Sequence, residues 1–339
     1  MKKKLFIISS EKISSLDGKN FFCDNIDMQS TPEKLTEFFD VDVISKKTDK
    51  KKSMKINLNS INISGNIINY LIEVIKTTKN PNTKYLIISI SPYTFLACLI
   101  LRILGKKPFV YLRSNGFEEY KVILGTLGYI IYFLMFSITS KISSLISCRK
   151  HILKGNDGHI VNPSQLDIEW KKNLITPQTI ETKLLYVGRI RKEKGIFALI
   201  KILEKKSDIK LTIVGQEKEI NRDIKNKNID ALTIINDKKN LIKIYDQHNI
   251  FILPSFTEGH PMVLLEALSR LRPVIIFKEI EHVIGNFKGI FVAERNIESL
   301  IEKTNFIKKN YEKIQKEMTA NKLPSNKEFI TSLRDIMIN

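Results

Sequence analysis

The chain has little cysteine. Its 339 residues contain three, Cys23, Cys98 and Cys148, an odd number of residues that lie far apart. No two of them form a Cys-x-x-Cys pair, so the pattern argues against both a disulfide framework and a cysteine zinc site. Histidine is also scarce, and its five residues lack ligand-like spacing, so we expect no metal site. These features predict a protein of a reducing compartment, the cytoplasm.

The amino-terminal segment lacks the apolar run of a secretory signal. Three lysines are followed by only four apolar residues, Leu5–Ile8, whereas a signal core needs about 7–15. We therefore expect these four residues to form a first buried strand.

Acidic residues are outnumbered, 36 against 55 Lys and Arg, which gives a net charge of +19. Most of the basic residues are lysine, and Lys, Ile and Asn are the residues that AT-rich codons favour. No zinc-finger, aromatic RNA-binding or arginine-rich signature accompanies the charge, so we expect no nucleic acid partner. The lysine-rich run Lys46–Lys55 is interpreted as a solvated loop, or as a site of contact with anionic lipid headgroups.

One stretch lacks charge altogether. Val122–Ser140 lies between Lys121 and Lys141, and its length approaches the ~20 residues that span a bilayer. Predicted strands flank it on both sides, and a spanning segment would divide a parallel sheet. We therefore expect a buried helix here, with a helix lying in the membrane interface as the alternative.

Short apolar runs alternate with helical patterns along the rest of the chain. Predicted strands lie at 5–8, 41–45, 85–90, 109–112 and 145–148, and again at 183–187, 209–214, 232–235, 250–253, 273–277 and 290–292. Predicted helices lie between them at 32–39, 64–77, 92–104, 194–205, 219–227, 240–247 and 261–271. This alternation predicts an α/β protein with two doubly wound parallel sheets.

The alternation lapses between the two halves, where prolines and polar residues gather. We expect a first domain at 1–165, a linker at 166–182, a second domain at 183–325, and a carboxyl-terminal helix at 326–339 that returns to the first domain. Ligands of such sheets bind beyond the carboxyl ends of the strands, so we expect a site in a cleft between facing halves.

The segment after the predicted strand at 250–253 is rich in functional groups. It runs from Pro254 to Pro261 and opens a helix, in whose first turn a proline is favoured. Unpaired backbone N–H groups and the positive end of the helix dipole there would attract an anion. Glu258 and Glu266 beside them are suited to accept hydrogen bonds from sugar hydroxyls. A capped helix with two solvated glutamates is the alternative.

A second segment follows the predicted strand at 183–187. Gly188 permits a tight turn, and Arg189 and Lys194 come directly after it. Arginine binds phosphate oxygens through two N–H groups and lysine acts as a point charge, so this pair is suited to a diphosphate. A basic surface turn is the alternative, although arginine is scarce in this chain.

Together the two segments resemble the donor half of glycosyltransferase family 4, whose members are retaining enzymes of the GT-B fold. Val187–Gly195 matches its V-G-R-x-x-x-x-K-G turn, and Glu258–Glu266 matches its E-G-x-P-x-x-x-x-E motif. The resemblance covers about residues 183–293. It implies two Rossmann-like domains and metal-independent, retaining transfer from a nucleotide diphosphate sugar, which acts as co-substrate in place of a cofactor.

The resemblance also implies a role for each motif residue. Glu258 would contact the transferred sugar as a catalytic residue, and Glu266 would bind the ribose of the nucleotide. The residues that would hold the donor diphosphate are Arg189, Lys194, Gly259, His260, Met262 and Val263.

Two departures from the family pattern stand out. The small-residue turn after the strand at 209–214 is Gly215-Gln216-Glu217, so nucleobase contacts there are expected to differ. Asn115 stands where the family commonly has a histidine, and we expect it at the catalytic position. The leaving diphosphate itself can act as the base in such a transfer.

The predicted function is transfer of a sugar to a hydroxyl acceptor, a growing surface glycan or its lipid carrier. The protein would work in the cytoplasm, with peripheral contact on the inner face of an anionic membrane. Two alternatives remain: a non-catalytic protein that binds a nucleotide sugar or glycan, and a sugar-nucleotide epimerase of the same fold.

Overall fold

The computed structural model describes residues 2–204, 208–216 and 227–338. The chain forms two compact units, and each has its own sheet and core. The first comprises Met1–Pro163 with Lys327–Asn339, and the second comprises Ser164–Asn326. Residues 219–226 of the helix predicted at 219–227 lie outside the described residues.

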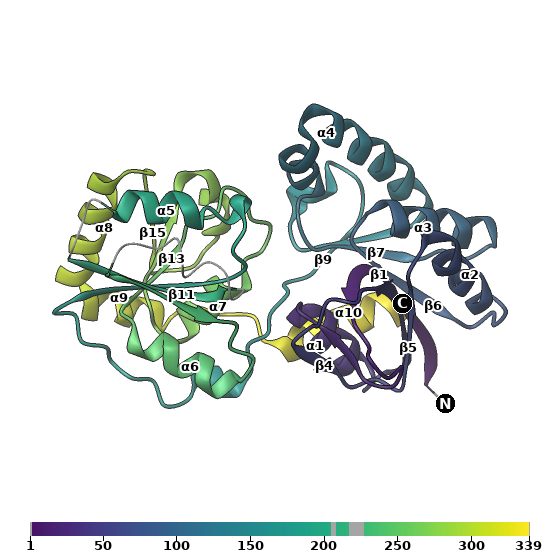
Figure 1. Ribbon diagram of the computed structural model, residues 1–339, viewed down its shortest axis with the longest axis horizontal. Coiled ribbons are helices and arrows are strands. Elements are labelled where there is room, and N and C mark those ends of the chain that lie inside the picture. Colours follow the sequence, from purple (N-terminus) through teal and green to yellow (C-terminus); the bar gives the residue numbers. More distant parts are fainter. Residues whose placement is uncertain (1, 205–207, 217–226, 339) are drawn as a thin grey trace. The chain divides into compact units, whose positions relative to one another are not determined.

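The first unit is built on a parallel sheet, which among the described residues has seven strands in the order β5-β3-β1-β6-β7-β8-β9 (Figure 1). Its strands are β1 (Lys3–Ile13), β3 (Phe39–Lys47), β5 (Ser60–Ser64), β6 (Lys84–Ile88), β7 (Phe109–Leu112), β8 (Ser144–Ser147) and β9 (His159–Ile160). A separate antiparallel pair is formed by β2 (Phe21–Cys23) and β4 (Met54–Ile56). The sequence patterns missed β2, β4 and β5, because these strands are short and only partly buried.

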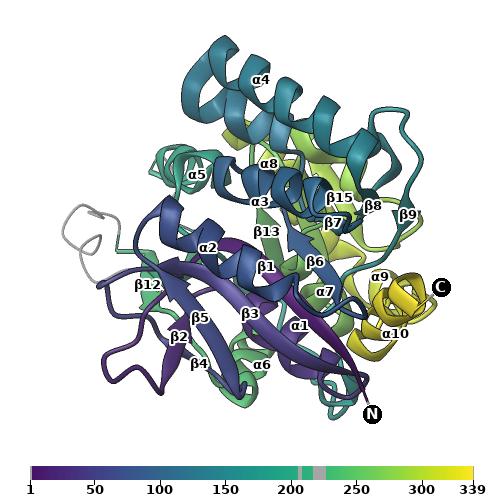
Figure 2. The same ribbon diagram turned by 90° about the vertical axis from the view of Figure 1, so that its right-hand side faces the viewer.

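Helices cover both faces of this sheet. One face carries α2 (Ile67–Thr77), α3 (Pro92–Ile103) and α4 (Gly116–Ile142), whose buried side chains share one core cluster (Figure 2). The other face carries α1 (Ile26–Leu35) and α10 (Asn326–Ile338) in a second cluster. The carboxyl-terminal helix therefore packs on the first sheet, where Leu333 and Met337 are fully buried.

The prediction of a helix over 32–39 is wrong in its position. The helix α1 begins at Ile26, where the side chain of Asn25 accepts a hydrogen bond from the backbone N–H of Asp27. Pro32 was interpreted as a helix start but lies inside the helix, and Phe39 already opens β3. An asparagine cap before the proline was the stronger start signal.

The helix α4 folds back on itself at Gly125, whose φ of 64° and ψ of −148° are not helical. The rings of Phe117 and Phe136 have centroids 5.1 Å apart, whereas a straight helix would separate these residues by about 28 Å. Gly128 makes the fold-back possible, because a Cβ there would lie 2.0 Å from the carbonyl oxygen of Tyr120. The uncharged stretch thus forms a hairpin of two helical segments, Gly116–Leu124 and residues 126–142.

The second unit is a parallel sheet, with six strands among the described residues, in the order β12-β11-β10-β13-β14-β15. Its strands are β10 (Thr182–Val187), β11 (Ile209–Gln216), β12 (Ile229–Thr233), β13 (Ile250–Leu253), β14 (Val274–Phe277) and β15 (Ile290–Ala293). Its helices are α5 (Ile196–Leu203), α6 (Lys238–Gln247), α7 (Met262–Ser269), α8 (Ile297–Lys309) and α9 (Tyr311–Met318). The strand predicted at 232–235 begins three residues earlier and ends two residues earlier.

The segment 166–182, predicted as a linker, packs firmly on the second unit. Trp170 is buried against the ring of Tyr245, and Leu166 lies in the same core. The guanidinium groups of Arg270 and Arg272, each 1% exposed, share the carboxylate of Asp246. Other N–H groups of the two arginines hold the segment through the backbone oxygens of Trp170, Lys172, Asn173 and Ile175.

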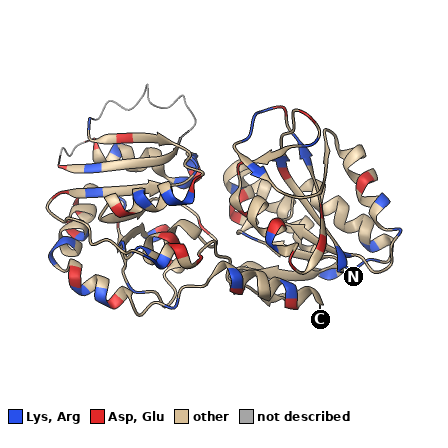
Figure 3. Cartoon of the chain, turned by 90° about the horizontal axis from the view of Figure 1, so that it is seen from below, with Lys and Arg blue, Asp and Glu red and all other residues tan. Residues whose placement is uncertain are grey.

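The charges of the chain are interspersed, as Figure 3 shows for one view of both units. The three cysteines are unpaired and buried, all in the first unit. Burial raises the pKa of Cys23 to about 11 and the pKa values of Cys98 and Cys148 to about 12.

Removing the shared carboxylate is expected to destabilise the second unit strongly. Asp246→Ala leaves two buried guanidinium groups without a counter-charge, which costs about 3–5 kcal/mol of unfolding free energy. The fluorescence of Trp170, the only tryptophan, reports unfolding of this unit in urea. Glu181→Ala, which breaks an exposed pair with Lys210, is the control and is expected to change little. An Asp246→Ala transition at the wild-type urea concentration would contradict this account.

Candidate functional site

The two predicted motifs follow neighbouring strands of the second unit. The strands β10 and β13 pair in parallel, with Leu184 opposite Ile250 and Leu185 opposite Phe251. Their carboxyl ends therefore lie at the same edge of the sheet, and the loops that leave them meet there. In open α/β sheets this edge is where ligands bind.

The two loops are held together by backbone contacts. Gly195 has a φ of 66°, and a Cβ at this position would lie 1.9 Å from the carbonyl oxygen of Pro254. Two residues before Gly195, the carbonyl oxygen of Glu193 accepts a hydrogen bond from the backbone N–H of Phe256 at 2.9 Å. Glycine at 195 is thus required for the close approach that brings Lys194 to the second loop.

Lys194 and Glu258 form an ion pair at the centre of this edge. The Nζ of Lys194 lies 2.7 Å from Oε1 of Glu258, whose side chain is 9% exposed. The hydroxyl of Ser255 donates to the same oxygen at 2.6 Å. The lysine and one of the motif glutamates, predicted separately, therefore act as a unit.

Arg295, which sequence reasoning missed, fixes the loop after β13. Its guanidinium donates to the carbonyl oxygens of Pro254 and Ser255 at 2.9 and 3.3 Å. It lies between the rings of Phe256 and Phe277, with its central carbon 4.0 and 4.3 Å from their centroids. This arginine follows β15, so no local pattern connected it to the motif.

The loop leads into α7, which begins at Met262 after Pro261. No side chain in the described part of the chain caps this helix, so the first-turn amides, including those of Met262 and Val263, have no side-chain acceptor at the cap there. Gly259, His260 and Pro261 form the approach to it. The structure thus provides the positive helix end that the sequence predicted.

Glu266 lies inside α7 and is buried. The hydroxyl of Tyr245, from α6, donates to its Oε2 at 2.9 Å. Burial and the neighbouring carboxylate raise the pKa of Tyr245, so its hydroxyl stays protonated and keeps donating. Tyr245 is therefore a positioning residue for Glu266. The sequence placed it on a predicted helix without a role.

Arg189 is exposed at the end of β10, beside Gly188. Its backbone oxygen accepts a hydrogen bond from the hydroxyl of Tyr186 at 2.8 Å. Gly215, at the end of β11, lies so close that a Cβ would stand 2.2 Å from the oxygen of Gly188. Glu217, the last residue of the turn Gly215-Gln216-Glu217 that differs from the family pattern, lies outside the described residues.

Asn115 belongs to the first unit, between β7 and α4. It is the residue before the first turn of α4, and its Oδ1 is buried with no hydrogen-bond partner among the described residues. Its assignment as a catalytic residue stays a prediction. Over the described ranges 2–204, 208–216 and 227–338, no group of three or more His, Cys, Asp or Glu residues is arranged to hold a metal ion.

The second unit and known glycosyltransferases are similar in sequence. Residues 169–323 match the family described as glycosyl transferases group 1. The capsular polysaccharide biosynthesis glycosyltransferase CapM of Staphylococcus aureus is 30% identical over 133 residues, 35% of this chain and 34% of that protein. An uncharacterized glycosyltransferase of Haemophilus influenzae is 30% identical over 169 residues, 45% of this chain and 46% of that protein. The matches thus span about a third and just under half of these relatives.

Solved structures extend the likeness over the whole chain. Sucrose-phosphate synthase from Thermosynechococcus elongatus has a TM-score of 0.72 at 15% identity, with 98% of each chain covered. WaaG, a glycosyltransferase involved in lipopolysaccharide biosynthesis, has a TM-score of 0.68 at 13% identity, with 98% and 99% covered. HepE of Anabaena, in complex with UDP and glucose, has a TM-score of 0.69 at 9% identity, with 99% and 98% covered. Residues 169–323 therefore match the group 1 glycosyltransferases in sequence, and the chain as a whole has the GT-B fold.

Proposed function

We propose that the protein is a glycosyltransferase that moves a sugar from a nucleotide diphosphate sugar to a hydroxyl acceptor, with retention of configuration. The observation that carries the proposal is the Lys194–Glu258 pair between the loops after β10 and β13. The sequence match over 169–323 supports it, because this range contains both loops.

The diphosphate of the donor would be held by positive charge at this edge. Arg189 is exposed at the end of β10, and Lys194 is paired with Glu258 in the loop that leads into α7. Such preorganised charges stabilise a leaving diphosphate as negative charge develops on it. The leaving diphosphate would itself accept the proton of the acceptor hydroxyl, since a histidine is missing at position 115.

The sugar would be held by Glu258. An ionised carboxylate offers about four lone-pair sites, of which Lys194 and Ser255 occupy two on one oxygen. The others are suited to accept hydrogen bonds from sugar hydroxyls. Glu266, oriented by Tyr245, would in the same way bind the hydroxyls of the ribose.

The acceptor would be a surface glycan or its lipid carrier. Two similar proteins, CapM and WaaG, carry names from capsular polysaccharide and lipopolysaccharide synthesis, which favours this class. The protein would then work in the cytoplasm, in peripheral contact with an anionic membrane. A second candidate, a non-catalytic protein that binds nucleotide sugars, is favoured by Asn115 alone. Sugar transfer by the wild-type chain from a panel of UDP-, GDP- and ADP-sugars distinguishes the two.

Removing either basic side chain should weaken nucleoside diphosphate binding. Hydrogen bonds to charged groups are worth about 1.5–3 kcal/mol, so Arg189→Ala and Lys194→Ala should each lower affinity about tenfold or more. Lys194→Ala also leaves Glu258 unneutralised, and adding Glu258→Gln should recover part of the loss. Titration calorimetry with UDP, GDP and ADP is the measurement.

Lys192→Ala is the matched control, because this exposed lysine lies in the same turn, η3 (Lys192–Lys194). Its affinity should equal that of the wild type. Unchanged affinity in both Arg189→Ala and Lys194→Ala would remove the assignment of the diphosphate site.

Substitutions of Glu258 and Glu266 should have different effects on turnover and on nucleoside diphosphate affinity. Glu266→Gln should weaken nucleoside diphosphate affinity several-fold, because the ribose contact is made with or without the sugar. Glu258→Gln should reduce turnover far more than nucleoside diphosphate affinity, because its partner is the transferred sugar. Turnover that survives both substitutions would show that the motif has another role.

No metal ion is proposed for the reaction, because Arg189 and Lys194 supply positive charge to the diphosphate. We expect sugar transfer to continue in excess EDTA at its original rate. Complete loss that Mg²⁺ or Mn²⁺ restores would refute metal independence and leave the donor-site assignment to the binding experiments.

A further inference from the structure

The helical hairpin of α4 carries a large exposed apolar surface. Its exposed large apolar side chains are between 38% and 71% exposed, and they are Val122, Ile123, Leu124, Leu127, Tyr129, Ile130, Phe133, Leu134 and Ile138. Large apolar side chains that are exposed together in this way are unusual on a monomer, whose exposed apolar side chains are mostly scattered singly. A surface of this kind marks a place of interaction.

The fold-back at Gly125 explains why the turn of the hairpin is exposed on all sides. In a straight helix on a sheet, consecutive residues alternate between core and solvent with a period of about 3.6. Here every residue from Lys121 to Leu127 is exposed, and a Cβ at Gly125 would meet nothing within 4 Å. The turn of the hairpin therefore projects from the unit and ends in the apolar side chains of Val122, Ile123, Leu124 and Leu127, which we call the tip.

The base of the hairpin is rigid. Phe117 contacts the rings of Tyr129, Tyr132 and Phe136, with centroids 4.8–5.4 Å apart. Tyr132 is buried by these contacts, and so is Phe136. The tip is thus held out by a packed aromatic cluster, and substitutions in the tip leave that cluster intact.

The hairpin is not a membrane span. By length and composition, Gly116–Ile142 is the one helix in the described ranges that passes as a candidate span, and 28% of its most apolar window is buried. Its longer segment, residues 126–142, measures about 25 Å, less than the ~30 Å hydrocarbon core. The strands on either side, β7 and β8, pair directly in register from Phe109 with Ser144 to Leu112 with Ser147. Both ends of the hairpin therefore return to one sheet.

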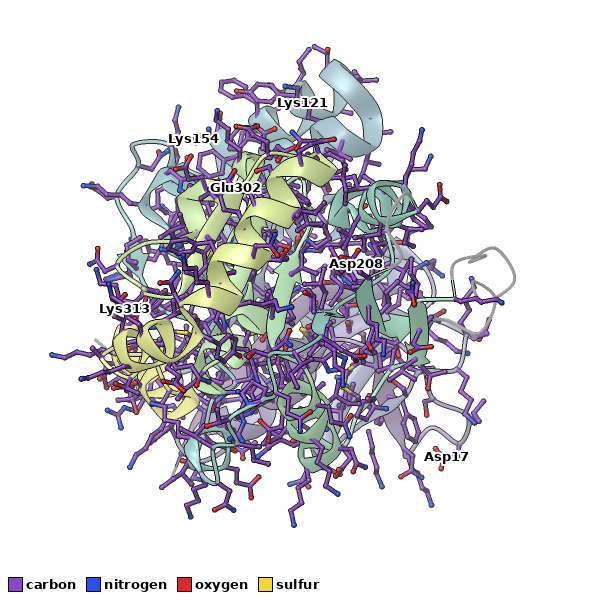
Figure 4. All side chains as sticks on the ribbon, turned by 90° about the vertical axis from the view of Figure 1, so that its left-hand side faces the viewer. Asp17, Lys121, Lys154, Asp208, Glu302 and Lys313 are labelled. Carbon is purple, nitrogen blue, oxygen red and sulfur yellow. The ribbon has the colours of Figure 1, made fainter. Side chains whose placement is uncertain are left out.

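The charges around the hairpin favour lipid over protein. Lys121 and Lys141 bracket the apolar surface, and both are exposed. Lys154 approaches from the loop after β8, with its Nζ 5.1 Å from the ring of Phe117. Figure 4 shows Lys121 and Lys154 at the same end of the view as α4. Glu119 is the one exposed acid within the hairpin, and the chain carries a net charge of +19.

We propose that the tip and the adjoining face of α4 form a membrane-binding surface that inserts into one leaflet of an anionic bilayer. The apolar side chains of the tip enter the boundary between headgroups and acyl chains, and the bracketing lysines stay at the headgroups. The partner is the lipid surface itself. This inference rests on the membrane contact proposed above but not on sugar transfer.

The lysine run 46–55 lies away from the tip of the α4 hairpin. Its end enters β4, which pairs with β2 and packs in the cluster on the face of the sheet opposite to α4, whereas Lys46 at its start lies over the ring of Tyr93 on α3. Within this run Lys52 is already paired with Asp24 at 2.6 Å. If the hairpin inserts as proposed, we expect Lys50, Lys51 and Lys52 to be dispensable for binding.

Flotation of the full chain with vesicles of phosphatidylcholine and phosphatidylglycerol tests the proposal. The triple variant Ile123→Gln, Leu124→Gln, Leu127→Gln should lose more than about tenfold in vesicle affinity. The matched control places the same change at Ile68, Ile72 and Ile75, which are exposed on α2 of the same unit. It should float as the wild type does, and so should Lys50→Gln with Lys51→Gln and Lys52→Gln.

Insertion into the bilayer can also be measured by tryptophan fluorescence. In Ile123→Trp, emission should shift to the blue and be quenched by brominated lipid, whereas Ile68→Trp should show neither effect. The native Trp170 is buried and contributes the same background to both variants. Nucleoside diphosphate binding should stay unchanged in the tip variant, so failure here is distinct from failure of the proposed transferase.

Two outcomes would overturn the proposal. One is equal flotation of the wild type and the tip variant. The other is absence of vesicle binding by the wild type together with a dimer in sedimentation that the tip variant abolishes, since the surface would then bind a second copy of the chain.

Discussion

The second unit depends on one buried carboxylate shared by two buried arginines. Asp246 accepts from Arg270 and Arg272, whose side chains are each 1% exposed. One negative charge cannot neutralise two positive ones, so the remaining N–H groups bind backbone oxygens of the segment 170–175 and its surroundings. All five N–H groups of Arg270 have an acceptor in this way. A segment with a linker's composition becomes part of the domain because it supplies those oxygens.

The same cluster reaches the candidate site. Arg272 donates to the backbone oxygen of Tyr245, and Tyr245 in turn donates to Glu266. At the other loop Arg295 fixes Pro254 and Ser255, and Ser255 with Lys194 fixes Glu258. Each motif glutamate therefore accepts a hydrogen bond from a residue, Tyr245 or Ser255, whose backbone oxygen is bound by an arginine. Preorganisation of this kind limits the reorganisation that a bound donor would require.

The sequence predicted well what local patterns determine. Apolar runs located β7, β10 and β13 within a residue, and the two spaced motifs located loops that the structure brings together. The sequence patterns did not predict contacts between residues that lie far apart along the chain. Tyr245 and Arg295 reach the motif after β13 through contacts between residues 21 to 41 positions apart, which no spacing along the chain encodes. The patterns also failed where composition is uniform. All residues from 122 to 140 are uncharged and most are apolar. Periodicity therefore could not separate the buried face of α4 from the exposed one, or reveal the fold-back at Gly125.

The burial of all three cysteines has a practical consequence. Only the thiolate reacts with alkylating reagents, and burial keeps these thiols protonated at neutral pH, with pKa values of about 11 to 12. The surface of the folded protein therefore presents no cysteine that reacts with thiol reagents. A cysteine introduced at any exposed position would be the single reactive sulfur, and a spin label or fluorophore attached there would report on that position alone.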